Sequence, residues 1–328
     1  MEYRTLGKTG FEVSEVSLGT WQVGGGWGAP FDDTTAEEIL NTAIDLGVNF
    51  IDTADVYGGG KSEAAVGRVV RSRSEKVYVA TKCGRRIDPH VAEGYTPEVL
   101  ETFVHDSLEN LGLERIDLIQ LHCPPTEVYY RPEIFDLFDR LKEQGKIRYL
   151  GVSVEKVEEG IKALQYPNVS TVQIIFNMFR HRPAELFFDL AAEADVGVIT
   201  RVPLASGLLT GKFTRKTTFS PEDHRRFNRQ GDAFDQGETF SGVDYERGLD
   251  AVQELESCFP EEPGLALWAL RWVLTFDEVS CVIPGASKLR HVRANVRASE
   301  MPSLTDEQMA CVERVYREYI KESVHQRW

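Results

Sequence analysis

Short hydrophobic runs alternate with longer amphipathic stretches along most of the chain. The runs are rich in Val, Ile and Leu and nearly continuous, which is typical of parallel strands buried on both faces. The predicted strands are Val16–Leu18, Asn49–Asp52, Val77–Thr81, Asp117–Leu121, Ile147–Val152, Thr171–Phe176, Val198–Arg201 and Cys281–Ile283. Two further short strands, around Tyr3–Thr5 and Glu12–Ser14, flank a turn of Gly, Lys, Thr and Gly and predict a hairpin.

Helix start and stop signals lie between the predicted strands. Residues 35–38 have the spacing of a capping box and predict a helix that runs to Leu46 and is ended by Gly47. Thr96 followed by Pro97 opens another helix, and Pro132–Gln144 forms a third. A second capping box at Thr305–Gln308 predicts a C-terminal helix that extends to about Val324.

Eight strands that alternate with helices predict an α/β fold, a (β/α)8 TIM barrel with an N-terminal β-hairpin and a C-terminal extra helix. An open doubly wound sheet is the alternative, but no glycine-rich dinucleotide turn follows the first strand. Residues 1–328 are expected to form one domain, because α/β barrels commonly reach this length. The interval between the seventh and eighth predicted strands is the longest. Within it Phe213–Tyr245 is polar and mixed in charge, and we expect this segment to be a mobile excursion on the active-site rim.

The charge, hydrophobicity and cysteine content of the chain argue against several classes of protein. Thirty-seven Lys and Arg stand against 52 Asp and Glu, a formal net charge of −15, which argues against a nucleic-acid partner. Neither a membrane-length hydrophobic stretch nor a signal-peptide core is present, so we expect a cytoplasmic protein with no membrane partner. The cysteines at positions 83, 123, 258, 281 and 311 form no paired motif. They predict reduced thiols, and no sequence motif indicates a metal site.

Four residues form a candidate catalytic site. Asp52, Lys82 and His122 each stand where a predicted strand ends, and Tyr57 follows the first of these strands closely. A phenol with a pKa of about 10 can donate the proton that carbonyl reduction needs, and the ammonium of Lys82 would lower that pKa. Asp52 would balance the charge of Lys82, and His122 would orient the substrate oxygen. Each residue alone is more often structural, so the hypothesis depends on the combination.

The sequence around these residues resembles the aldo-keto reductase family. Residues 47–58, with Ser62 and Glu63, resemble the family signature around its Asp and Tyr, residues 79–82 resemble its lysine segment, and residues 117–122 resemble its histidine segment. The resemblance extends from the hairpin to about Ala298. It implies that Asp52, Tyr57, Lys82 and His122 form the family's catalytic tetrad.

The resemblance also implies an NADP(H) cofactor. Ser153 and Gln173 match positions that bind the nicotinamide carboxamide, residues 203–212 resemble the loop that covers the pyrophosphate, and residues 282–288 resemble the segment that holds the adenosine 2′-phosphate, where Lys288 supplies charge. The residues implied to bind the cofactor are Gly19, Thr20, Trp21, Asp52, Ser153, Gln173, Arg201, Pro203, Leu204, Ser206, Gly207, Leu209, Gly211, Lys212, Gly285, Ser287, Lys288, His291 and Asn295. Without this context, Lys288 and the arginines that follow it would be read as a solvated helix face.

Three positions depart from the family pattern. Val154 stands where Asn is common, which removes a polar contact. Arg201 stands where many members place an aromatic residue that stacks on the nicotinamide. A planar guanidinium can also stack, so we expect Arg201 near the ring or a phosphate. His291 occupies a position that is often Gln, and we expect it near the adenine.

Together these features predict an NADP(H)-dependent oxidoreductase that interconverts an aldehyde, ketone or sugar carbonyl and the alcohol, with a small-molecule carbonyl substrate as its partner. One alternative is a Schiff-base lyase with Lys82 as nucleophile, which requires a lowered lysine pKa that Asp52 would oppose. The other is a cofactor-sensing regulatory subunit, since some relatives resemble channel-associated proteins. Substrate identity, reaction direction, the strictness of the NADP preference and oligomeric state stay open.

Overall fold

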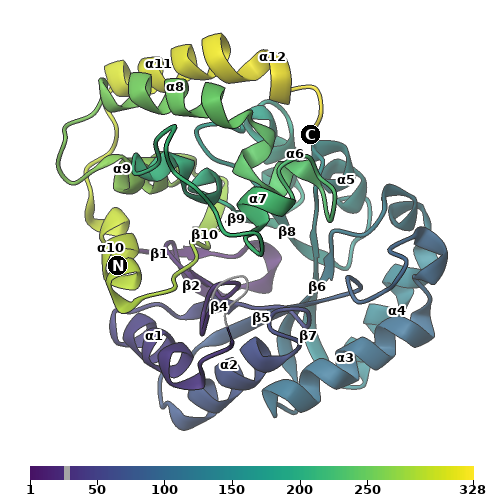
Figure 1. The fold of residues 1–328 in the computed structure, drawn as a ribbon. Helices are drawn as coiled ribbons and strands as arrows, with labels where there is room; N and C mark the ends of the chain where they lie inside the picture. Colours follow the sequence, from purple (N-terminus) through teal and green to yellow (C-terminus); the bar gives the residue numbers. More distant parts are fainter. Residues whose placement is uncertain (26–29) are drawn as a thin grey trace.

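The centre of the molecule is a barrel of parallel strands, seen in a computed structural model that describes residues 1–25 and 30–328 (Figure 1). Within these residues eight strands pair in the order β10-β9-β8-β7-β6-β5-β4-β3, and each neighbouring pair is parallel. The strands are β3 (Leu18–Gly19), β4 (Phe50–Asp52), β5 (Tyr78–Cys83), β6 (Ile116–His122), β7 (Ile147–Ser153), β8 (Val169–Ile175), β9 (Gly197–Arg201) and β10 (Val279–Val282). Bridges from Val16 to Val282 and from Gly19 to Gly285 join the two ends of the sheet. The expected (β/α)8 barrel is therefore confirmed.

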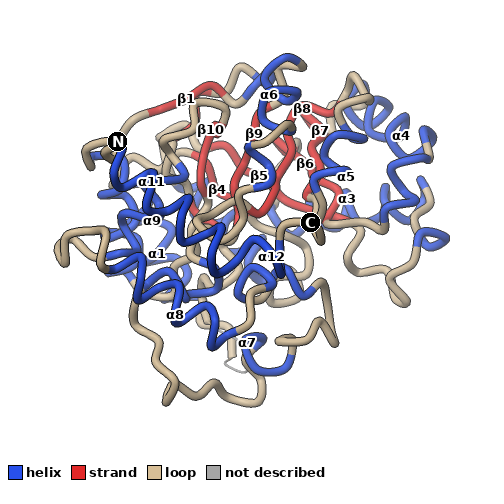
Figure 2. The backbone as a smooth tube through the Cα atoms, turned by 90° about the horizontal axis from the view of Figure 1, so that it is seen from above, coloured by secondary structure: helices blue, strands red, loops and turns tan. Residues whose placement is uncertain are grey.

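Helices surround the strands on the outside of the barrel (Figure 2). The helices that follow successive strands are α1 (Asp33–Asp45), α2 (Lys61–Ser72), α3 (Pro97–Leu111), α4 (Pro132–Glu143), α5 (Val157–Ala163), α6 (Phe187–Glu193) and α10 (Leu289–Val296). The interval between β9 and β10 contains α7 (His224–Phe227), α8 (Tyr245–Glu256) and α9 (Leu265–Val273). The C-terminal segment consists of α11 (Asp306–Val315), a π-helical turn (Tyr316–Ile320) and α12 (Lys321–Val324). Each helix in the described part of the chain is too short or too polar to cross a membrane.

A hairpin closes the end of the barrel where the strands begin. Its strands, β1 (Tyr3–Thr5) and β2 (Glu12–Ser14), pair antiparallel as predicted. Phe11, which directly precedes β2, is 2% exposed and stacks on Tyr78 of β5 with ring centroids 4.1 Å apart. Because apolar side chains fill this end of the barrel, polar groups have room only at the carboxyl ends of the strands.

Of the three predicted residues that open a helix, two are confirmed as N-caps. Thr96 and Thr305 cap α3 and α11 as expected, and the last helical segment reaches Val324. The cap at Thr35 is wrong, because α1 begins at Asp33 and its cap is Asp32. The Asp32 side chain accepts a hydrogen bond from the Thr35 N–H at 3.1 Å, which satisfies a free donor of the first turn.

The prediction that every cysteine is reduced is wrong for two of the five. Cys258, at the end of α8, forms a disulfide with Cys311 of α11, and their Cα atoms are 6.4 Å apart. The pairing arises because α8 and α11 pack together, although their sequence separation is 53 residues. Spacing along the chain therefore gave no signal. Cys83, Cys123 and Cys281 are free and buried.

Residues 213–245 lie on the rim of the barrel, as predicted, and contain short helical turns at Gln236–Glu238 and Phe240–Gly242 in addition to α7. The guanidinium of Arg225 lies 4.7 Å from the ring centre of Phe219. Such cation–π contacts help to hold a polar segment against the barrel. Glu238 from this segment reaches Arg85 at the barrel mouth. The mobility of the segment stays a prediction.

We expect Phe11→Ala to lower the free energy of unfolding by about 3–5 kcal/mol, because it empties the buried contact with Tyr78. The hairpin residue Tyr3 offers a matched control, since its ring is 46% exposed. Tyr3→Phe removes only its hydrogen bond to the Gly47 carbonyl and should cost about 1 kcal/mol. Urea unfolding measures both changes, and equal small losses would show that the hairpin does not close the core.

Candidate active site

Asp52 and Lys82 form a buried ion pair at the carboxyl ends of neighbouring strands. Lys82 Nζ donates to Asp52 Oδ2 at 2.5 Å and to the carbonyl of Thr53 at 2.8 Å. The exposed fractions of the two side chains are 1% for Lys82 and 3% for Asp52. An ammonium in this position requires a counter-charge, which the carboxylate supplies as predicted.

Two amide side chains complete the bonding of the Asp52 carboxylate. Gln120 Nε2 and Gln173 Nε2 donate to Asp52 Oδ1 at 2.9 and 2.8 Å. Gln120 was not predicted, although it stands two residues before His122 on β6 and therefore shares its face of the strand. Burial lowers the pKa of Lys82, but Asp52 and Tyr57 outweigh burial and the net pKa is raised. The lysine is therefore an ammonium at neutral pH.

Tyr57 stands beside this ammonium, with its hydroxyl 3.5 Å from Lys82 Nζ. Its half-buried ring meets the imidazole of His122 edge to face, with centroids 6.0 Å apart, and Trp21 stacks on its other side at 6.4 Å. Burial raises the pKa of Tyr57 and Lys82 lowers it, and the net direction is upward. Lys82 lowers the pKa of Tyr57, as predicted. The expected net lowering is wrong, because the effect of burial is larger than that of Lys82. The phenol is protonated at neutral pH.

His122 is buried at the end of β6 and close to a guanidinium. Arg85 Nη1 lies 3.5 Å from His122 Nε2. His122 Nδ1 has no hydrogen-bond partner within the described residues. Burial and the charges of Arg85 and Lys82 hold the pKa of His122 well below its usual range. The ring is therefore neutral and has one donor to offer.

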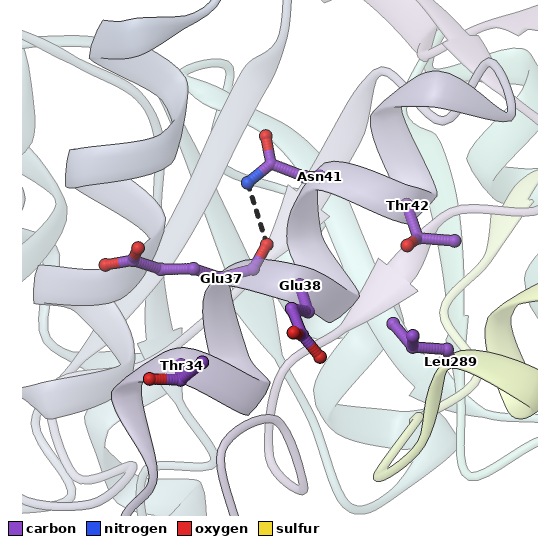
Figure 3. A pocket seen from close by; sticks show the side chains of 6 residues that line it. All are labelled: Thr34, Glu37, Glu38, Asn41, Thr42 and Leu289. Atoms are coloured by element: carbon purple, nitrogen blue, oxygen red, sulfur yellow. Dashed lines mark hydrogen bonds between the residues drawn. The ribbon is translucent and has the colours of Figure 1, made fainter.

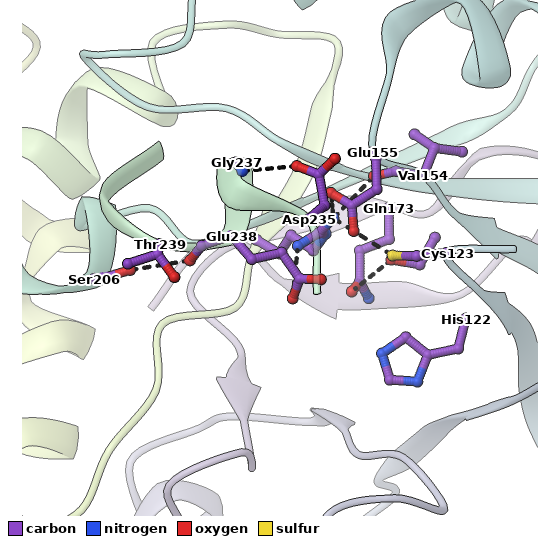
Figure 4. A network of polar contacts seen from close by, with 12 residues as sticks. His122, Cys123, Val154, Glu155, Gln173, Ser206, Asp235, Gly237, Glu238 and Thr239 are labelled. Carbon is purple, nitrogen blue, oxygen red and sulfur yellow. Dashed lines mark hydrogen bonds and ion pairs between the residues drawn. The ribbon is translucent and has the colours of Figure 1, made fainter. Parts of the chain in front are cut away.

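A network of charged residues lies near His122 at the barrel mouth (Figure 4). Arg85 pairs with Glu238, and Arg201 pairs with Glu155 at 2.9 Å and with Glu238 at 3.6 Å. Burial raises the pKa of Glu155 to about 8. Burial would also raise the pKa of Glu238, but Arg85 and Arg201 lower it to about 2. The guanidinium of Arg201 is thus held by carboxylates, and its contact with a nicotinamide or phosphate stays a prediction.

Sequence reasoning missed three members of this network. Arg85 stands three residues after Lys82, and Glu155 stands two residues after Ser153, so both follow predicted strand ends closely. That position is a usable signal, because loops after barrel strands line the mouth. Glu238 gave no such signal, since it lies deep in the interval between β9 and β10.

The segment after β9 has an unusual backbone conformation. Ala205, Ser206 and Gly207 follow one another with φ values of +46°, +54° and +101°. The N–H groups of Ala205 and Gly207 donate to the carbonyls of Val202 and Leu204 at 3.0 and 2.8 Å, which holds the segment in a tight turn. Non-glycine residues in this conformation are strained, and such strain gathers at functional sites. The segment contains the predicted cofactor residues Pro203, Leu204, Ser206, Gly207, Leu209, Gly211 and Lys212.

The side chains of this segment differ in whether they are available to bind a ligand. Leu209 is fully buried in the core, so its side chain is not available to a ligand. Ser206 Oγ accepts from the N–H of Phe240 and donates to the carbonyl of Glu238, both at 3.1 Å, which ties the segment to the excursion. Lys212 is exposed.

A local basic patch forms where the segment after β9 approaches the start of α10. Lys212, Lys288 and Arg290 all lie near His291, and after burial their charges lower its pKa. Ser287 Oγ lies 3.4 Å from His291 Nδ1, and Asn295 donates to the exposed Gly285 at 3.4 Å. In a chain with a net charge of −15, this concentration of positive charge fits a phosphate group.

The remaining predicted cofactor residues surround the tetrad. Gly19 ends β3, and Thr20 donates from its N–H to the Asp52 carbonyl at 2.9 Å. Ser153 ends β7, and its hydroxyl donates to Gln173 Oε1 at 3.4 Å. The structure thus brings the two predicted carboxamide-binding residues into contact with each other and next to Asp52.

Two cavities lie outside this constellation. One, of about 500 Å³, lies between α1 and α10, and its lining residues are Thr34, Glu37, Glu38, Asn41, Thr42 and Leu289 (Figure 3). The other, of about 730 Å³, lies between the loops after β5 and β6, and its lining residues are His90, Val91, Ala92, Glu93, Pro125, Glu127, Tyr130 and Arg131. Neither cavity is lined by a residue of the tetrad. The position of the candidate active site is therefore inferred from the cluster of polar residues around Asp52 and Lys82 and not from cavity size.

Comparisons with known proteins agree with this geometry. A family model described as the aldo/keto reductase family matches residues 15–317. The chain is 30% identical over 317 residues to the uncharacterized oxidoreductase YqkF of Bacillus subtilis (strain 168), an alignment that covers 95% of this chain and 96% of that protein. It is 27% identical over 310 residues to the NADH-specific methylglyoxal reductase of Escherichia coli (strain K12), covering 89% and 92%. The solved structure of the glycerol dehydrogenase AKR11B4 from Gluconobacter oxydans superposes with a TM-score of 0.78 at 30% identity, covering 97% of this chain and 96% of that chain.

We expect Asp52→Asn to destabilise the protein by about 3–5 kcal/mol, because it leaves the buried Lys82 ammonium without a counter-charge. Asp33→Asn is a matched control, since it removes a carboxylate from the exposed pair with Arg68 and should cost less than about 1 kcal/mol. Urea unfolding at neutral pH measures both variants. A loss for Asp52→Asn no larger than for Asp33→Asn would contradict the claim that Lys82 is charged.

Proposed function

Because this chain belongs to the aldo/keto reductase family of oxidoreductases, we propose that it interconverts an aldehyde, ketone or sugar carbonyl and the corresponding alcohol by using NADP(H). The observation that carries the proposal is the Tyr57 hydroxyl at 3.5 Å from an ammonium that Asp52 holds charged. A protonated phenol beside a fixed positive charge is a proton donor whose conjugate base is stabilised.

In the proposed mechanism the residues of this chain manage the proton and the charge on oxygen. When bound, the nicotinamide supplies the hydride to the carbonyl carbon. The rings of Tyr57 and His122 meet edge to face with centroids 6.0 Å apart, so both side chains are placed to bond one carbonyl oxygen. As negative charge develops on that oxygen, Tyr57 donates its proton, and the Lys82 ammonium stabilises the phenolate that results. Oxidation of the alcohol uses the same groups in reverse, with the Tyr57 phenolate as base.

The preference for NADP(H) over NAD(H) is supported by the basic patch at the start of α10. Lys212, Lys288 and Arg290 gather near His291, and a 2′-phosphate would add two negative charges there that an unphosphorylated ribose lacks. The relative in Escherichia coli is named as NADH-specific, so the family alone does not decide the cofactor. The patch is the reason for proposing NADP(H).

The two alternatives fit the site less well. A Schiff-base lyase needs a neutral lysine, whereas the pKa of Lys82 is raised and its ammonium is bonded to Asp52. A purely regulatory subunit would have no use for a positioned proton donor, and turnover at enzyme-like rates of about 1–10³ s⁻¹ would exclude it. A cytoplasmic location stays part of the proposal. The free thiols of Cys83, Cys123 and Cys281 support it, whereas the disulfide of Cys258 and Cys311 is of a kind more common outside the cytoplasm.

We expect Tyr57→Phe to abolish carbonyl reduction and to leave NADPH binding nearly unchanged, because it removes only the proton donor. Steady-state kinetics measure the first effect and fluorescence titration measures the second. In the wild type, the rate of reduction should stay level through neutral pH and fall only above the ordinary phenol pKa, because the pKa of Tyr57 is raised and its acid form persists. Wild-type-like turnover in Tyr57→Phe would contradict the proposed role.

We expect Lys288→Ala to weaken NADPH binding roughly tenfold and to leave NADH binding unchanged, because the side chain would bond only the 2′-phosphate. Arg297→Ala is the control, since Arg297 is also exposed and basic but lies beyond the end of α10. Fluorescence titration with each cofactor gives the dissociation constants. An equal loss for both cofactors would assign Lys288 a structural role.

A further inference from the structure

Arg85 is a charged group next to the place where the proposed substrate oxygen binds. Its Nη1 atom lies 3.5 Å from His122 Nε2, and its side chain is 21% exposed. The guanidinium is held in position from the opposite side, because its Nη2 atom bonds to Glu238 and lies 3.9 Å from Glu155. A rigidly held arginine therefore faces the substrate space beside the imidazole.

The two terminal nitrogens of Arg85 differ in their hydrogen bonding. Its hydrogen bond to a carboxylate uses Nη2, and within the described residues its Nη1 atom has no acceptor besides the imidazole, at the long distance of 3.5 Å. A guanidinium has five N–H donors in a planar fork that matches a carboxylate. Donors of this kind remain for a ligand while Glu238 stays in place, so no rearrangement of residues 213–245 is needed.

The charge around Arg85 favours an anion. Two guanidiniums, those of Arg85 and Arg201, share Glu155 and Glu238. Burial raises the pKa of Glu155 to about 8 and so opposes its ionisation, whereas Arg85 and Arg201 favour the ionised form of Glu238. The two guanidinium charges are therefore not fully balanced by the two carboxyl groups.

The same group of residues is unfavourable for binding a metal cation. Cys123, Glu155 and Glu238 bring ligand-type atoms within 4.8 Å of one another, which by spacing alone could hold a metal ion. Arg201 donates to Glu155 at 2.9 Å, lies 3.5 Å from Cys123 Sγ and pairs with Glu238, and Arg85 also pairs with Glu238. Guanidiniums already occupy the positions from which a metal would be bound, so the network selects for negative charge.

We propose that Arg85 is a specificity-determining residue and that the preferred substrates are 2-oxo acids, in which a carboxylate adjoins the carbonyl. This inference rests on the proposed function. The 3.5 Å between Arg85 and His122 sets this class, because a group bonded to Arg85 must lie on the carbon next to the carbonyl that His122 contacts. The carboxylate would pair with the donors of Arg85, and the carbonyl oxygen would lie between His122 and Tyr57.

The test compares a 2-oxo acid with its own methyl ester, for example phenylglyoxylate with methyl phenylglyoxylate, in NADPH-dependent reduction. The measured quantity is the ratio of kcat/KM for the acid to kcat/KM for the ester, in the wild type and in variants. We expect Arg85→Leu to lower this ratio about ten- to a hundredfold, the size of a charge-assisted hydrogen bond. Arg85→Lys, which keeps the charge but loses the fork, should give an intermediate ratio and guards against loss of structure in the leucine variant.

Arg86→Leu is the matched control, because Arg86 is the next residue, is 39% exposed and pairs with Asp106. Its acid-to-ester ratio should equal that of the wild type. An unchanged ratio in Arg85→Leu and Arg85→Lys, with the ester still reduced by the wild type, would overturn the inference and leave the proposed function intact. A wild type that reduces neither the acid, the ester nor any aldehyde would overturn the proposed function and the inference with it.

Discussion

The site depends on one interaction, the buried ion pair between Asp52 and Lys82. A buried charge pair is costly unless its geometry is good and its other polar atoms are bonded. Both conditions are met here, because Gln120 and Gln173 bond to one carboxylate oxygen and Lys82 bonds to the other. The strand register sets this arrangement, since Asp52, Lys82 and Gln173 lie at the carboxyl ends of β4, β5 and β8. The barrel thus supplies a fixed positive charge at its centre.

The charge of Lys82 shapes the electrostatics of its neighbours. It opposes the effect of burial on Tyr57, and together with burial and Arg85 it keeps His122 neutral. At the mouth, Glu238 from the excursion at residues 213–245 pairs with both Arg85 and Arg201. That long segment is therefore connected by ion pairs to Arg201 and to Arg85, whose guanidinium lies 3.5 Å from His122.

The sequence predicted the barrel and the position of the tetrad because both follow from short-range patterns. Continuous apolar runs locate the strands, and a polar residue at a strand end must lie on one rim of the barrel. Residues such as Gln120 could have been found by the same alternation. The ion pairs of Glu238 and the disulfide of Cys258 could not, because they depend on how distant segments pack. The net rise in the pKa of Tyr57 also escaped prediction, since it is a balance between burial and charge that only the structure shows.

The measurement that tests this account most directly is the ionisation of Lys82, followed by NMR of protein labelled at the lysine side chains and assigned with a Lys82→Met variant. The account predicts that the Lys82 signal keeps the chemical shift of an ammonium through neutral pH and beyond the ordinary lysine pKa, because Asp52 outweighs burial. A signal of neutral amine at pH near 7 would contradict it. That result would remove the charge that supports Tyr57 and would return Lys82 to the role of nucleophile.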